Sequence, residues 1–90
     1  MLDYLIVGKI VNSKGLSGEV KVSPMTKSPG RFDDLSFAYV DSHGEKIKYG
    51  IEHVSYTNKF VLIKLDGINS LEKAQKLKGQ YLYVDRSNAI

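Results

Sequence analysis

The chain has 90 residues, which is enough for one small domain with a thin hydrophobic core. With 42% hydrophobic and 26% charged residues, the composition is typical of a globular domain and not of a disordered segment. The lack of cysteine excludes disulfides and thiolate metal sites, which suits a cytoplasmic protein. The two histidines are isolated and cannot supply a structural zinc site, so we expect no metal and no cofactor.

The formal net charge of +3 is unevenly distributed along the chain. Residues 1–32 carry five basic and two acidic side chains, a net charge of +3. Residues 33–69 carry four basic and six acidic side chains (net −2), and residues 70–90 carry four and two (net +2). Basic ends around an acidic middle are expected if one face of the fold meets a polyanion. Chance clustering on a solvated surface is the alternative.

Two β-strands are predicted first, joined by a glycine turn. Residues 5–11 are rich in aliphatic side chains, and residues 19–23 alternate between valine and polar positions. Between them lies the sequence GLSG, in which Gly15 and Gly18 can adopt backbone angles closed to other residues. The segment 24–29 begins and ends with proline and cannot be a central strand.

The spacing of these glycines also matches a loop with which KH domains clamp a nucleic-acid backbone. That loop joins two helices, whereas strand periodicity flanks GLSG, so the context argues against a KH domain. A Walker-type phosphate loop is excluded because no Gly-Lys-Ser/Thr follows. GLSG is therefore predicted to be primarily a turn. Its backbone amides and the neighbouring lysines can also bind phosphate.

The rest of the chain is also predicted to form short β-strands separated by turns, with one exception. Further strands are predicted over residues 35–40, 46–56 (with a bulge near Gly50), 60–65 and 81–84. The sequence NSLEKAQKLKG instead has apolar residues at helical spacing, which predicts a short helix over residues 70–78, capped by Asn69 or Ser70. We therefore expect an all-β fold, a six-stranded antiparallel β-barrel with one short α-helix near the C-terminus.

No catalytic site is expected, because the spacing suggests no nucleophile and base pair. Basic and glycine residues around the first turn are candidates for contacts with a polyanion: Lys9, Lys14, Gly15, Gly18, Lys21, Lys27 and Arg31. A second set lies opposite the predicted core face of its strands and is a candidate interdomain or partner surface: Phe60, Leu62, Tyr81 and Tyr83. We expect the helix, through Leu71, Ala74 and Leu77, to cover most of this second set.

Two blocks of the sequence resemble the RimM family of bacterial ribosome maturation factors. The blocks are VGKIVNSKGLSGEVKVSPMTKSPGRF and FVLIKLDGINSLEKAQKLKGQYLYV. The first block carries the family pattern at Gly8, Lys9, Ile10, Gly15, Gly18, Glu19, Val20, Thr26, Pro29, Arg31 and Phe32. The second carries it at Gly67, Ile68, Ala74, Leu77, Gly79, Leu82 and Val84. The resemblance extends over nearly the whole chain.

The resemblance implies a translation-factor-like Greek-key barrel without catalytic activity. It implies an assembly factor for maturation of the head of the small (30S) ribosomal subunit, with 16S rRNA and a ribosomal protein of the head as partners. Family members usually continue into a second, PRC-type barrel, so residues 1–90 are expected to be the N-terminal domain of a longer protein. A cytoplasmic monomer is expected, with no membrane or DNA partner.

Two other functions stay open at this point. A general barrel that binds single-stranded RNA needs exposed aromatic residues for base stacking, which Tyr39, Tyr49 and Tyr56 could supply. A barrel of the flavin-reductase kind would be an enzyme, and flavin retained on purification would reveal it.

Overall fold

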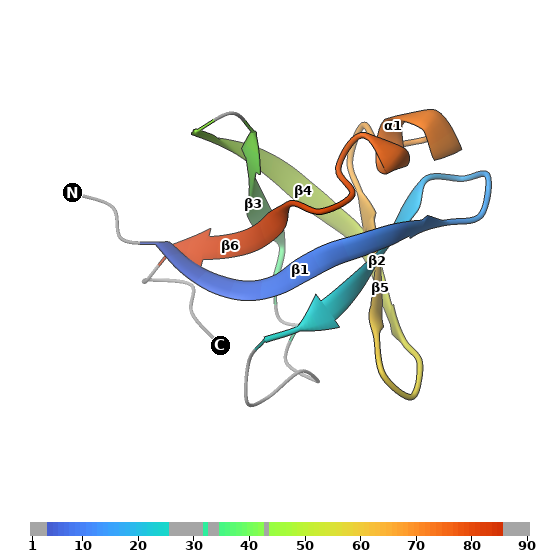
Figure 1. Cartoon of the computed structure of the whole chain (residues 1–90), viewed down its shortest axis with the longest axis horizontal. Coiled ribbons are helices and arrows are strands. Elements are labelled where there is room, and N and C mark those ends of the chain that lie inside the picture. The colour runs from blue at the N-terminus through green and yellow to red at the C-terminus, as the bar shows by residue number, and fades with distance from the viewer. Residues whose placement is uncertain (1–3, 26–31, 33–34, 43, 86–90) are drawn as a thin grey trace.

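The computed structural model describes residues 4–25, 32, 35–42 and 44–85. Within these residues the strands are β1 (Tyr4–Lys14), β2 (Glu19–Pro24), β3 (Phe37–Ser42), β4 (Glu45–Tyr56), β5 (Val61–Leu65) and β6 (Tyr81–Asp85), with helix α1 (Leu71–Gln75). The strands close into a barrel in the order β1-β2-β5-β4-β3-β6 (Figure 1). The predicted all-β barrel with one short helix is confirmed.

All neighbouring strands of the barrel run antiparallel. Hairpins join β1 to β2, β3 to β4 and β4 to β5, whereas the β2–β3 and β5–β6 connections cross to strands that are not adjacent, as in a Greek key. Because β6 pairs with both β1 and β3, the first and last strands of the chain lie side by side (Figure 1). Closure pairs the edges that a small open sheet would expose.

Most strand boundaries lie close to the predicted ones, and two differ. Strand β3 begins at Phe37, two residues later than predicted; the Leu35 amide before it donates to the Phe32 carbonyl and not to a neighbouring strand. Strand β1 continues as far as Lys14. The irregularity predicted near Gly50 of β4 lies just after it, where the register with β5 shifts between Ile51 and His53.

Alternating strand residues fill the barrel, because successive side chains of a strand point to opposite faces. The fully buried side chains include Ile10, Val20, Val22, Phe32, Val40, Ile63, Leu65, Leu82 and Val84. Phe32, which follows the predicted proline-bracketed segment, is among the largest of them. The resulting core is continuous and leaves the polar partners in each strand on the outside.

Helix α1 carries the chain from β5 across the ends of β1 and β2 to β6 (Figure 1). Ser70 is its N-cap, and its hydroxyl accepts a hydrogen bond from the Lys73 amide at 3.2 Å. Ala74 and Leu77 enter the core cluster. The helix is shorter than predicted, because turns follow from residue 76 to 79. In the described part of the chain, no helix is long and apolar enough to cross a membrane.

Candidate nucleic-acid interface

Two lysine–aromatic pairs lie on the outside of the barrel, one between β1 and β6 and the other between β2 and the residue directly before β5. The Lys9 Nζ lies 5.6 Å from the ring centroid of Tyr81, its partner in the β1–β6 register. The Lys21 Nζ lies 5.0 Å from the ring centroid of Phe60. Both distances are within the range of cation–π attraction, which limits the motion of each ammonium group. Two of the basic candidates and two of the aromatic candidates, expected on two separate surfaces, therefore lie in contact with one another.

The first turn has the backbone that its glycines were predicted to require. Gly15 and Gly18 have φ angles of +72° and +95°, in the left-handed region that favours glycine. Lys14 is exposed at the end of β1, in register with Glu19 on β2. The carboxylate of Glu19 therefore sits on the same face as Lys14 and reduces the positive potential there, so the strand lysines are the stronger candidates.

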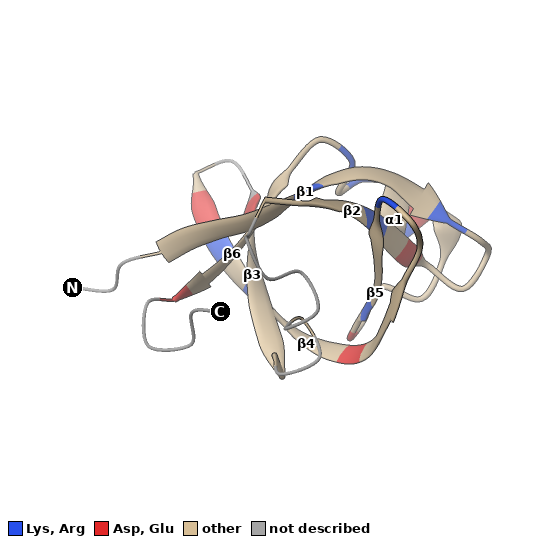
Figure 2. Ribbon diagram, turned by 90° about the horizontal axis from the view of Figure 1, so that it is seen from below, with Lys and Arg blue, Asp and Glu red and all other residues tan. Residues whose placement is uncertain are grey.

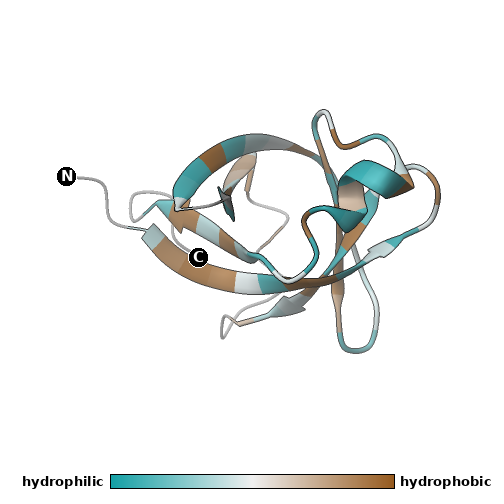
Figure 3. Ribbon diagram, turned by 45° about the horizontal axis from the view of Figure 1, so that its top comes forward, coloured by the Kyte–Doolittle hydropathy of each residue, from teal (hydrophilic) through white to brown (hydrophobic). Residues whose placement is uncertain are grey.

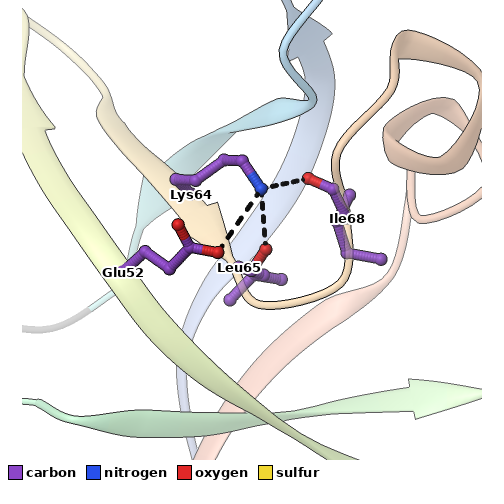
Figure 4. A network of polar contacts seen from close by, with 4 residues as sticks. All are labelled: Glu52, Lys64, Leu65 and Ile68. Carbon is purple, nitrogen blue, oxygen red and sulfur yellow. Dashed lines mark hydrogen bonds and ion pairs between the residues drawn. The ribbon is translucent and has the colours of Figure 1, made fainter.

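A partly buried lysine, Lys64, stabilises the loop against which this turn packs (Figure 4). The Lys64 ammonium donates to the carbonyl oxygens of Ile68, at 2.5 Å, and Leu65, at 3.1 Å. Its third neighbour is Glu52 on β4, at 3.8 Å between Nζ and Oε2. The Ile68 carbonyl in turn packs against Gly18. Lys64 thus stabilises the loop between β5 and α1 and is not available as a surface cation.

Tyr83 belongs to a second aromatic cluster, on the outer side of β1, β6, β3 and β4. Its ring lies edge-on to Tyr4, which also packs edge-on against Tyr39, with centroids 6.5 and 5.0 Å apart. The Lys46 ammonium lies over Tyr83 at 4.5 Å and over Tyr4 at 5.5 Å. Desolvation raises the pKa of Tyr39 from its usual value of 10.0, with further repulsion from Asp85 and Tyr4. The cluster's rings pack against one another and against a lysine.

The structure corrects part of the expected apolar surface. Leu62 is only 5% exposed, so its side chain adds little to any docking face. The helix packs mainly on β1 and β2, and Phe60 and Tyr81 are half-buried. Leu5 and Ile6, which the sequence did not single out, are instead exposed by 36% and 42%, in the apolar first half of β1 (Figure 3). A register irregularity between Ile6 and Gly8 breaks the alternation of β1: Val7 and Gly8 are both buried, and Ile6 is turned outward.

Lys27 and Arg31 lie outside the described residues. In the described ranges, basic and acidic positions are distributed around the barrel, so charge alone does not single out one face (Figure 2). Tyr39, Tyr49 and Tyr56 do not form one stacking face: Tyr39 lies in the aromatic cluster, Tyr49 packs against the core, and Tyr56 is 42% exposed near the β4–β5 turn.

The described residues form a small closed antiparallel β-barrel with lysine–aromatic pairs on its outer surface. Residues 5–89 match the family model of the RimM N-terminal domain, and the chain belongs to the RimM family. The ribosome maturation factor RimM of Ruminiclostridium cellulolyticum is 46% identical over 90 residues, and that of Clostridium perfringens strain SM101 is 50% identical over 90 residues. All of this chain is matched, but only 53% and 52% of those proteins, so the chain spans about half the length of these relatives.

Two solved structures share the architecture. The crystal structure of a RimM protein from Pseudomonas aeruginosa, named for 16S ribosomal RNA processing, superposes with a TM-score of 0.87 at 28% identity. The match covers 97% of this chain and 53% of that one. The solution structure of the N-terminal domain of RimM from Thermus thermophilus has a TM-score of 0.78 at 18% identity, covering 97% and 94% of the two chains, and shows the fold alone. None of these names describes an enzymatic reaction, and the flavin-reductase alternative gains no support from them.

Proposed function

We propose that the chain is a non-catalytic, cytoplasmic assembly domain that helps the small ribosomal subunit to mature by binding 16S rRNA. The names of the relatives and of the Pseudomonas structure support a role in ribosome maturation and 16S rRNA processing. The resemblance further suggests the head of the 30S subunit, and a ribosomal protein of the head, as the place of contact. Because the relatives are about twice as long, we also propose that a further, C-terminal barrel carries part of the binding.

The observation that carries this proposal is the placement of Lys9 and Lys21 over aromatic rings, Tyr81 of β6 and Phe60 directly before β5. Cations held at fixed positions on a twisted sheet can contact successive phosphates of an RNA backbone. Such contacts orient the RNA without reading its sequence, which suits a factor that recognises the shape of a folding subunit. Lys14, at the end of the same β-hairpin, extends the basic face toward the glycine turn.

Co-sedimentation of the chain with immature small subunits tests the proposal. The variant Lys9→Glu/Lys21→Glu should lower the bound fraction, because two phosphate contacts become repulsive. The matched control is Lys73→Glu/Lys78→Glu, which reverses two exposed charges at the helix and the turn after it, outside the two lysine–aromatic pairs. Equal loss in the two variants would show only a dependence on net charge, and no loss in either would remove the proposed face.

A further inference from the structure

A hollow of about 180 Å³ opens beside the β4–β5 turn. This turn lies at the end of the barrel opposite α1 (Figure 1). Its lining combines the end of β2, the end of β4 and the whole turn: Pro24, Tyr56, Thr57, Asn58, Lys59, Phe60 and Val61. Two of these side chains are aromatic. Tyr56 is 42% exposed, and Phe60 is half-buried beneath the Lys21 ammonium. Part of the surface of these two aromatic rings is therefore accessible to a ligand that enters the hollow.

Hydrogen bonds hold the turn in one shape before any ligand arrives. The Thr57 amide donates to the Phe60 carbonyl at 2.9 Å, and the Phe60 amide donates to the Thr57 hydroxyl oxygen at 3.0 Å. Asn58 and Lys59 form the exposed tip between these residues. A turn that is already closed loses less conformational entropy when it binds, which favours a ligand site here.

The polar groups around the hollow favour an anionic ligand with hydrogen-bonding edges. Lys59 lies on the rim and Lys21 lies beside Phe60, and no lining residue is acidic. Asn58 carries a carboxamide, which both donates and accepts hydrogen bonds and can pair with the edge of a base. Stacking surface, cations and one amide are the groups that proteins use for single-stranded nucleic acid.

We propose that this hollow binds one unpaired base of single-stranded RNA, stacked on Tyr56 or Phe60, with flanking phosphates on Lys21 and Lys59. The proposal rests on the rRNA-binding function proposed above and adds a base contact to a face otherwise suited to phosphates. A duplex cannot use the hollow, because its bases are already stacked on one another. A cationic peptide would be repelled by the two lysines, which is why RNA is the occupant that the charges favour.

The test is fluorescence anisotropy of the 90-residue chain with short labelled oligouridine and oligoadenine, and with a duplex of the same length. Tyr56→Ala should weaken single-strand binding by roughly 5- to 100-fold, the effect of one lost stacking contact. Tyr56→Phe keeps the ring and should restore most of the affinity. Ile47→Ala is the matched control, since Ile47 is 39% exposed on the same strand, outside the lining of the hollow.

The proposal is overturned if Tyr56→Ala binds within about twofold of the unchanged chain, or if the duplex binds as tightly as the single strand. It is also overturned if a short capped peptide with proline and phenylalanine, and not RNA, shifts the amide NMR signals of Asn58 and Phe60. Parallel sedimentation with immature small subunits separates the two proposals. A chain that binds subunits but no oligonucleotide refutes the base site alone, and a chain that binds neither refutes both.

Discussion

Gly18 packs directly against the carbonyl group of Ile68. A Cβ atom at Gly18 would lie 2.5 Å from the Ile68 oxygen and 2.8 Å from the Ser70 amide nitrogen, and the φ angle there is +95°. At Gly15, in the same turn, φ is +72° but no atom lies within 4 Å of such a Cβ. One glycine therefore supplies only a backbone conformation, whereas the other also lets the turn approach the loop before α1.

This difference predicts unequal effects of the same substitution. Gly15→Ala should lower the free energy of unfolding by about 1 kcal/mol, the cost of a left-handed alanine. Gly18→Ala should cost about 2–4 kcal/mol, since it adds a backbone clash to that strain, and the bulkier Gly18→Val should cost at least as much. Urea unfolding of the three variants measures these values. Equal losses at the two positions would contradict the packing described here.

The hydrogen bonds of Lys64 to two carbonyl oxygens should contribute more to stability than its ion pair with Glu52. Lys64→Met removes the donor to the Leu65 and Ile68 carbonyls while keeping an apolar stem of similar length. We expect a loss of about 1–3 kcal/mol, because these carbonyls lose charge-assisted hydrogen bonds in a partly buried place. Glu52→Gln should cost less than about 1 kcal/mol, since the Glu52 side chain is 51% exposed. If both variants lost equal stability, the ion pair and not the carbonyl contacts would dominate.

Ionisation of Tyr39 should lower the stability of the fold at alkaline pH. Its pKa is raised from 10.0 in the folded state, first by desolvation and then by the charges of Asp85 and Tyr4. The folded protein therefore holds this proton more tightly than the unfolded chain. The contribution of Tyr39 to stability is fully present below pH 10 and is lost as the pH rises through the pKa of the folded state. Tyr39→Phe cannot ionise and should flatten that part of the decline. Thermal unfolding of the two proteins between about pH 9 and 11 provides the comparison.

Binding to RNA should depend strongly on salt if the outer face contacts phosphates. Two or three contacts predict a slope of roughly −2 to −3 in a plot of log affinity against log salt concentration. Lys9→Glu/Lys21→Glu should reduce the size of that slope by roughly 1 to 2, and similarly for unrelated RNA sequences, because phosphate contacts carry no sequence information. A slope unchanged by this double substitution would place the phosphate contacts elsewhere on the chain.

Much of the barrel could be predicted from the sequence, because the evidence for it is local. A strand with one buried face must alternate, as Val20 and Val22 do, and a helix that packs on a core must repeat near every third or fourth residue, as Ala74 and Leu77 do. The positive φ angles of Gly15 and Gly18 followed from a tight turn between two such strands and are confirmed. Each of these features depends on residues that are close neighbours in the chain.

The candidate site could be predicted only as separate groups of residues. Lys9 and Tyr81 come from opposite ends of the chain and meet only because β6 closes the barrel against β1. The burial of Leu62 and the exposure of Ile6 were missed for a related reason: packing between elements and a register irregularity override simple alternation.

The amino-acid sequence by itself therefore determined the elements of this protein, their order and their inward faces, since these depend on short-range periodicity and turn chemistry. Only the tertiary structure decided which outward side chains became neighbours. It placed the Lys9 ammonium over Tyr81, the Lys21 ammonium over Phe60, and the Ile68 carbonyl against Gly18. The physical reason is that strand pairing and barrel closure bring together residues whose separation along the chain leaves no local pattern.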